Sequence, residues 1–126
     1  MKLIIGGAFQ GKKKFAETLT GISAEKFADG RICAFSEIFE QPVICHFHEY
    51  LRRMLEKNMD TTVLIDEVVK RNRDLVIISN ELGYGVVPVE RFDRCYREAA
   101  GRACTQAAAA ADEVYRVICG IPTRIK

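Results

Sequence analysis

The chain has 126 residues, of which 48% are apolar and 29% charged, so its length and composition suit one compact domain with an ordinary core. Its 19 basic and 17 acidic residues leave a formal charge of +2 and are spread along the sequence, which argues against a nucleic-acid-binding face. No apolar run approaches the ~18 residues of a membrane span, and the N-terminus lacks a signal peptide's long apolar region. We therefore expect a cytoplasmic protein that binds neither nucleic acid nor membrane.

The five cysteines are odd in number, form no C-x-x-C pair and lie mostly inside apolar segments. Buried, reduced thiols are the ordinary state of such residues in a cytosolic protein. We expect this state for all of them: Cys33, Cys45, Cys95, Cys104 and Cys119.

The chain opens with a short apolar run at residues 2–5, followed by glycines and then by good helix formers from residue 12 to 19. This order predicts a strand, a glycine loop and a helix. The stretch GGAFQGKKK matches the phosphate-binding pattern G-x-x-x-x-G-K-[ST] at Gly6, Gly11 and Lys12, and it places Lys13 where a hydroxyl is expected. The strand-to-helix junction is the structural context that this pattern requires.

A glycine loop before a helix turns backbone N–H groups toward one point, where the helix dipole adds positive charge, so a phosphate is the expected ligand. Lys12 would contact the β- and γ-phosphates of ATP or GTP and act in catalysis, whereas Lys13 cannot ligate a cation, which questions Mg²⁺ as a cofactor. A glycine turn beside a lysine-rich helix start is the structural alternative. The predicted nucleotide-binding residues are Gly6, Gly7, Ala8, Phe9, Gln10, Gly11, Lys12 and Lys13.

The middle of the chain predicts further alternation of strands and helices. We expect a strand at residues 31–35, a connection at 36–41, a strand at 43–47 that passes into a helix, and a second helix at 61–72. Asp60 is placed to cap that second helix, and Asp66 and Glu67 are expected on its solvated side.

The second half begins with the continuously apolar run 74–80, which predicts a central strand covered on both faces. A long helix should follow at about 89–111, and then a strand, a Gly-Ile-Pro turn and a short final strand. One side of the long helix is expected to contain Phe92, Cys95, Tyr96, Ala99 and Ala103. The whole pattern predicts an α/β fold with a mainly parallel sheet flanked by helices, in which ligands bind at the carboxyl ends of the strands.

Glu81 directly follows the central apolar run, so its carboxylate should emerge at the ligand edge of the sheet. There it would act in catalysis, by binding a metal ion or orienting a substrate hydroxyl, or it would only fix a loop. Gly83, Gly85 and His48 complete this possible substrate or metal site. The two glycines suit backbone conformations that other residues avoid, and His48 is expected at the carboxyl end of a strand.

Several motifs of the second half occur together: N-E-x-G-x-G-x-V-P at residues 80–88, A-G-R at 100–102, then AAAAADEV and V-x-x-G-I-P-x-x-I-K. With the loop G-G-A-x-x-G-K at residues 6–12, they resemble the adenosylcobinamide kinase/adenosylcobinamide-phosphate guanylyltransferase family of cobalamin biosynthesis. The resemblance covers about the first 20 and the last 50 residues. It implies a single RecA-like P-loop NTPase domain over residues 1–126, often assembled as a homotrimer. It also implies use of ATP or GTP to phosphorylate a hydroxyl of cobinamide, and then GMP transfer through a guanylylated histidine.

The chain departs from that family in three ways: Lys13 replaces the usual serine, the middle is shorter, and the basic segment with the guanylylated histidine has no counterpart. His46 and His48 are the only histidines, and their spacing matches no nucleophile motif, so we do not transfer that role to either. Three interpretations stay open. The chain is a compact cobinamide-type kinase, a catalytically impaired nucleotide-binding or assembly protein of the same descent, or a structural domain that binds nothing.

Overall fold

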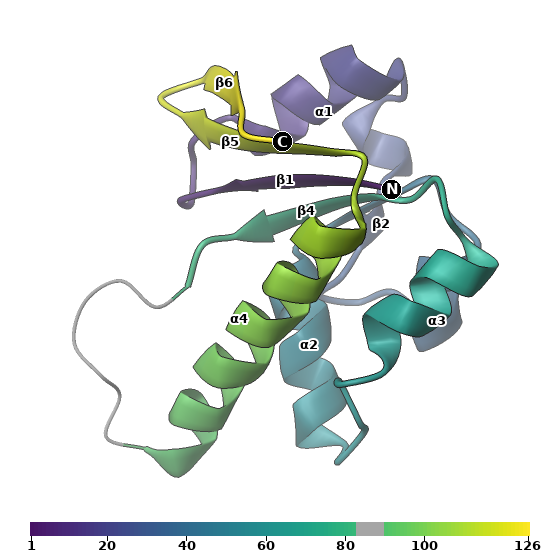
Figure 1. Ribbon diagram of the computed structural model, residues 1–126, viewed down its shortest axis with the longest axis vertical. Coiled ribbons are helices and arrows are strands. Elements are labelled where there is room, and N and C mark those ends of the chain that lie inside the picture. The colour runs from purple at the N-terminus through teal and green to yellow at the C-terminus, as the bar shows by residue number, and fades with distance from the viewer. Residues whose placement is uncertain (83–89) are drawn as a thin grey trace.

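The computed structural model describes residues 1–82 and 90–126 (Figure 1). Strands and helices mostly alternate along the chain, except that α3 follows α2 and β6 follows β5. The strands are β1 (Lys2–Gly6), β2 (Ala28–Asp29), β3 (Val43–Cys45), β4 (Val76–Asn80), β5 (Glu113–Ile118) and β6 (Ile121–Arg124). The α-helices are α1 (Lys12–Thr20), α2 (Phe47–Glu56), α3 (Leu64–Arg71) and α4 (Arg91–Ala110). Two 3₁₀ turns, η1 (Ala24–Lys26) and η2 (Phe35–Phe39), complete the described elements.

The strands form a six-stranded sheet in the order β2-β3-β4-β1-β5-β6. Every neighbouring pair is parallel except β5 and β6, which form an antiparallel hairpin at one edge. The apolar strand β4 lies between β3 and β1, and four of its five residues are buried. The predicted α/β class, with a mainly parallel sheet flanked by helices, is therefore confirmed.

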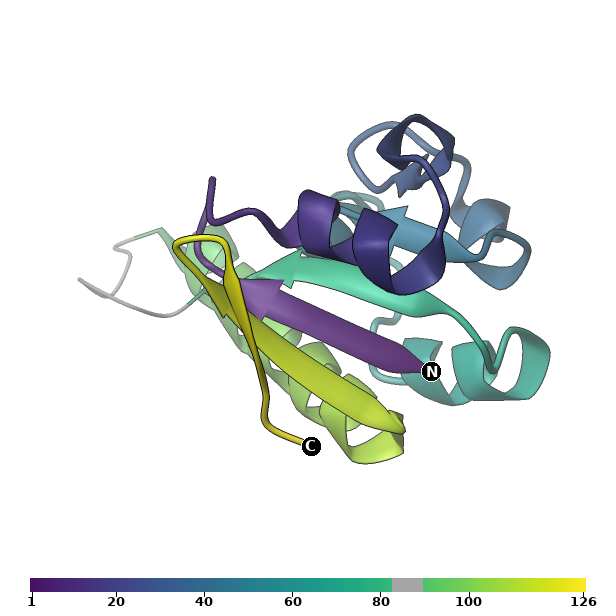
Figure 2. The ribbon, with the colours of Figure 1, turned by 90° about the horizontal axis from the view of Figure 1, so that it is seen from above.

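Helices cover both faces of the sheet, with α2, α3 and α4 on one side and α1 on the other (Figures 1 and 2). The alternation of side chains along each strand divides the core accordingly. Leu3 and Ile77 pack in the cluster with α2, α3 and α4, whereas Ile4 and Ile78 pack in the cluster with Ala16 of α1. Strands buried on both faces explain the continuous apolar runs of β1 and β4.

The register places the candidate site at the carboxyl edge of the parallel strands. Gly6 at the end of β1 lies opposite Asn80 at the end of β4, and the backbone N–H of Glu81 donates to the Gly6 carbonyl at 2.9 Å. Cys45, at the end of β3, pairs in register with Asp29 of β2. The segments that follow these strands therefore meet at one edge of the sheet.

The predicted strand at residues 31–35 is wrong, because the strand here is the shorter β2 and the chain turns directly after it. The Asp29 carboxylate accepts the Arg31 backbone N–H at 3.0 Å, and the Asp29 carbonyl accepts the N–H groups of Ile32 and Cys33. These local bonds satisfy the backbone in a turn, so the apolar character of Ile32 does not lead to burial; its side chain is 80% exposed.

The predicted helix at residues 61–72 is confirmed in type, but it begins later, at Leu64. The Asp60 carboxylate accepts hydrogen bonds from the backbone N–H and the hydroxyl of Thr62, at 2.9 and 2.6 Å, so it fixes the preceding turn and does not cap the helix. Asp66 is exposed and Glu67 is half-buried on α3, as expected for its solvated side.

The long helix α4 is confirmed, and its predicted side overlaps the buried side in part, through Tyr96 and Ala103. Cys95 is exposed and Ala99 only half-buried, whereas the buried residues are Tyr96, Ala100, Ala103 and Ala107. Their spacing of three and four residues is the ordinary helical contact face, and alanines there let α4 approach the sheet closely. All five cysteines are free thiols, yet the expectation of general burial is also wrong, because Cys95 and Cys119 are exposed.

Within residues 1–82 and 90–126, none of the helices has both the length and the apolar character needed to cross a bilayer.

Candidate functional site

The glycine loop joins β1 to α1, as predicted, and close backbone contacts shape it. A Cβ atom on Gly6 would lie 2.5 Å from the Val117 carbonyl oxygen of β5, so only glycine fits between these strands. Gly11 has a φ of 90°, a left-handed conformation that glycine adopts without strain, and it precedes the first residue of α1. The N-cap residue Gly11 has no side chain to cap α1, so the first N–H groups of the helix face the loop.

Lys12 is the first residue of α1 and is only 8% exposed. Its ammonium donates a hydrogen bond to the Gly7 carbonyl, so the side chain folds back toward the start of the glycine loop. Burial lowers the pKa of Lys12, while the negative charge of Glu81 acts in the opposite direction. A phosphate bound at the loop would add a second favourable partner for this ammonium.

The turn between β5 and β6 braces the loop from the side. The side-chain oxygen of Gln10 accepts the backbone N–H of Cys119, and the Gln10 carbonyl accepts the N–H of Gly120 at 2.9 Å. A Cβ on Gly11 would also come within 3.2 Å of the Gly120 Cα. The predicted Gly-Ile-Pro turn lies one step earlier, at Cys119 and Gly120, because Ile121 and Pro122 already belong to β6. Its contacts with Gln10 and Gly11 hold the loop in this shape.

A cavity of about 400 Å³ lies beside the loop. One wall is formed by residues 8–13, which are six of the eight predicted nucleotide-binding residues. The carboxyl ends of β3 and β4 form the opposite wall through Cys45, His46, Ile78 and Asn80, and Arg31 completes it. Sequence reasoning missed these five residues as site residues; the only available signal was their position at or near strand ends.

His46 follows β3 directly, has a φ of 51° and caps the start of α2. Burial lowers the pKa of its imidazole, and the nearby charges of Lys13 and Arg31 lower it further. The imidazole is therefore neutral at pH 7 and lines the cavity with an available nitrogen lone pair.

His48 does not lie at the carboxyl end of a strand, so that expectation is wrong. It lies in the first turn of α2, is 6% exposed, and its Nδ1 accepts the backbone N–H of Asn80 at 3.2 Å. Burial, with minor contributions from His46 and Lys12, lowers the pKa of His48 to about 4. A buried neutral imidazole that joins α2 to the end of β4 has a structural position, outside the loop cavity.

Glu81 emerges at the ligand edge, as predicted from its position after β4. Its carboxylate accepts two hydrogen bonds from the Arg116 guanidinium of β5, at 2.7 and 3.0 Å. Glu81 and Arg116 line a second cavity of about 400 Å³, together with Gly101 and Cys104 of α4. Arg116 was not predicted, because its side chain reaches Glu81 across β1, which lies between β4 and β5, and this is a tertiary contact. Gly83 and Gly85 lie outside the described residues.

Comparison with known proteins shows the lineage of the chain. The family model described as "Cobinamide kinase / cobinamide phosphate guanyltransferase" matches residues 37–125, which is more than half of the sequence. The chain belongs to this family. The sequence resemblance is thereby confirmed, and the α/β fold with a loop between β1 and α1 agrees with the P-loop character of the family.

Two curated relatives match a shorter segment. The "Bifunctional adenosylcobalamin biosynthesis protein CobU" of Salmonella typhimurium is 48% identical over 52 residues, which are 41% of this chain and 29% of that protein. The protein of the same name from Escherichia coli K12 matches with the same identity and coverage. The matched segment thus spans less than a third of each relative.

The loop of this family member does not fit the usual magnesium site of P-loop proteins. Lys13 replaces the hydroxyl that would ligate the ion, and its side chain is exposed beside the cavity. The Glu81 carboxylate is paired with Arg116, and Asp29 lies beside Cys45 and His46, whose sulfur and nitrogen magnesium does not favour. No step of the function proposed below therefore depends on magnesium.

Proposed function

We propose that residues 1–126 form a single nucleotide-binding domain and that the loop cavity holds the phosphates of ATP or GTP. The observation that carries the proposal is the loop geometry: α1 begins directly behind the glycine loop, and its first residue, Lys12, lines a cavity of about 400 Å³. Backbone N–H groups, a helix dipole and a buried lysine are the ordinary elements of a phosphate site.

For the chemistry, we propose phosphoryl transfer from the bound nucleotide to a hydroxyl of a cobinamide-type acceptor. The two relatives are named as bifunctional adenosylcobalamin biosynthesis proteins, which supports an acceptor of this class. Asn80 lines both the loop cavity and the second cavity, where Glu81 and Arg116 lie, so the two cavities adjoin at the end of β4. The acceptor would occupy the second cavity, with Glu81 near its hydroxyl and Lys12 on the phosphates.

Guanylyl transfer is not part of this proposal, because neither histidine lies in a recognisable nucleophile segment. We also propose, from the family resemblance, that the chain assembles as a homo-oligomer such as a trimer. Light scattering during size-exclusion chromatography tests that assembly directly, and a monomer at working concentration would contradict it.

A second candidate function is nucleotide binding or assembly without turnover. Lys13 favours it, because an ammonium supplies attraction for phosphate but cannot supply the coordination geometry of a metal ion. The two candidates differ in one measurement: phosphorylation of adenosylcobinamide by the purified chain with ATP or GTP. Measurable product supports the kinase, and nucleotide binding without product supports the second candidate.

Lys12→Ala tests the shared nucleotide site, with Lys14→Ala as its matched control. Both lysines lie in the first turn of α1, but Lys14 is exposed and does not line the cavity. Loss of a charge-assisted contact of ~1.5 to 3 kcal/mol predicts that Lys12→Ala weakens nucleotide binding by roughly 10- to 150-fold. Calorimetric titration with GTP and ATP, with and without magnesium, measures the effect. Equal affinities of the two variants would remove the loop from the site.

A further inference from the structure

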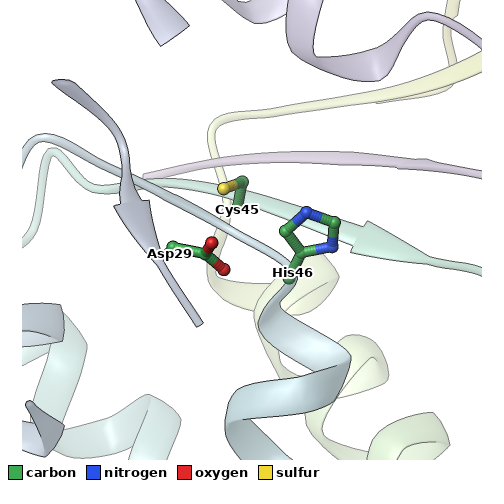
Figure 3. A group of neighbouring side chains, drawn as sticks. All are labelled: Asp29, Cys45 and His46. Carbon is green, nitrogen blue, oxygen red and sulfur yellow. The ribbon is translucent and has the colours of Figure 1, made fainter. Parts of the chain in front are cut away.

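Three residues with metal-binding side chains meet beside the loop cavity: Asp29, Cys45 and His46. One ligand atom from each lies within 4.8 Å of the other two. Figure 3 shows the carboxylate approaching from β2, while the thiol and the imidazole come from the end of β3 and the residue after it. We refer to these three residues as the β2–β3 cluster.

The backbone holds the cluster in place independently of any ligand. Asp29 and Cys45 are register partners on parallel strands, and the Gly30 N–H donates to the Cys45 carbonyl at 2.8 Å. A Cβ on Gly30 would collide with the His46 carbonyl oxygen, so glycine permits this close approach. The positive φ of His46 then turns its side chain out of the strand direction, toward the cavity.

The combination of ligand types selects the kind of ion. Thiolate, imidazole and carboxylate are the three common ligands of zinc, whereas magnesium and calcium favour sets of oxygen ligands. We propose that Asp29, Cys45 and His46 bind a zinc-type divalent ion with three protein ligands and a fourth position open to the loop cavity. The fourth coordination position faces the cavity, because Cys45 and His46 form part of the cavity wall.

Two of the three side chains are already in the protonation state that a metal ion needs. The hydrogen bond from Arg31 is the main cause that lowers the pKa of Asp29, so this carboxylate is ionised at pH 7. Burial lowers the pKa of His46, which leaves the imidazole neutral. Burial raises the pKa of the Cys45 thiol, so the incoming ion must displace its proton into solvent.

Neighbouring charges define the electrostatics of the cluster. Arg31 holds the Asp29 carboxylate with four contacts of 2.8 to 3.2 Å, from its backbone N–H, Nε and Nη2, which occupy all four acceptor positions of the two oxygens. The single Nε hydrogen is shared between both oxygens, so a metal ion can replace its longer contact, at 3.2 Å to Oδ2, while the other three contacts stay. In that arrangement Arg31 orients the ligand as an outer partner. The thiolate and the carboxylate balance the two charges of the ion, and the side chains of Lys13 and Arg31 are exposed to screening by solvent.

Titration of the chain with cobalt(II), without nucleotide, tests the proposal, because a cobalt–thiolate bond produces a charge-transfer band in the near ultraviolet. The full chain should bind one equivalent with this band and release one proton, and zinc should displace the cobalt. Cys45→Ser should abolish the band, whereas Cys95→Ser and Cys119→Ser should keep it, because those exposed thiols lie outside the cluster. The band surviving in Cys45→Ser, or its loss in either control, would overturn the proposal.

Since Cys45 is buried, the less buried ligands provide a second test that does not depend on a core substitution. His46→Gln and Asp29→Asn should keep the circular dichroism of the wild type. Each should weaken cobalt binding by more than the roughly 10- to 100-fold that loss of an outer partner costs. Wild-type affinity in both variants, or a wild-type chain that binds no cobalt, would equally refute the site. None of these measurements requires nucleotide binding, so they stay separate from the test of the proposed function.

Discussion

Protonation of His48 should couple the stability of the fold to pH. The Nδ1 atom of His48 accepts the Asn80 N–H, so a second proton on the imidazole would break that hydrogen bond and leave a charge in the core. Glu49 is the nearest carboxylate, with 3.9 Å between its Oε1 and the His48 Nε2, but its side chain is 38% exposed. Burial therefore determines the direction, and the pKa of His48 falls to about 4.

The sign and the size of the effect follow from this value. The folded pKa of about 4 lies below the ordinary value of 6.5, so between these pH values the unfolded chain binds more protons. The stabilising contribution is complete above pH 6.5 and is lost as the pH falls toward 4. With 1.36 kcal/mol per pKa unit, the two values predict a loss of about 2 kcal/mol between pH 7 and pH 5.

Urea unfolding followed by circular dichroism at pH 7 and pH 5 measures this loss. His48→Gln should remove most of it, because the glutamine amide oxygen still accepts a hydrogen bond but does not titrate. His46→Gln is the matched control: its imidazole is less buried, so this variant should retain most of the pH dependence. The reasoning fails if His48→Gln loses as much stability between the two pH values as the wild type.

Three further predictions concern the loop and its chemistry. Gly6→Ala should lower stability by about 1 to 3 kcal/mol in thermal melts, because the new Cβ meets the Val117 carbonyl oxygen. Gly101→Ala should not lower it, because a Cβ there has none of the described atoms within 4 Å, and equal melts of the two variants would contradict this. Nucleotide affinity should depend weakly on magnesium in the wild type and more strongly in Lys13→Ser, as measured by calorimetry in magnesium and in chelator; brisk, strictly magnesium-dependent turnover of the wild type would count against it. Incubation with labelled GTP should leave no acid-labile guanylyl label on either histidine, and a labelled histidine peptide would disprove that expectation.

Local sequence signals predicted the elements of the fold well where one segment contains the whole signal. The apolar run of β1, the glycines and the helix formers of α1 lie within residues 2–20, and the structure has the predicted order. Prediction failed where short local bonds competed with an apolar run, as after Asp29, where a turn replaces the expected strand. The buried side of α4 was predicted only in part, through Tyr96 and Ala103, since periodicity gives the spacing of a helix face but not the element that it contacts.

Some features of the candidate site could likewise be predicted from the sequence, and others could not. The sequence alone determined the α/β class, the loop of residues 6–13 between a strand and a helix, and the position of Glu81 at the end of β4. Only the tertiary structure decided which groups surround the loop: the β5–β6 turn that holds Gln10, the Arg116 partner of Glu81, and the β2–β3 cluster. The physical reason is that these contacts join segments far apart in the chain, which become neighbours only through the order of the strands in the sheet.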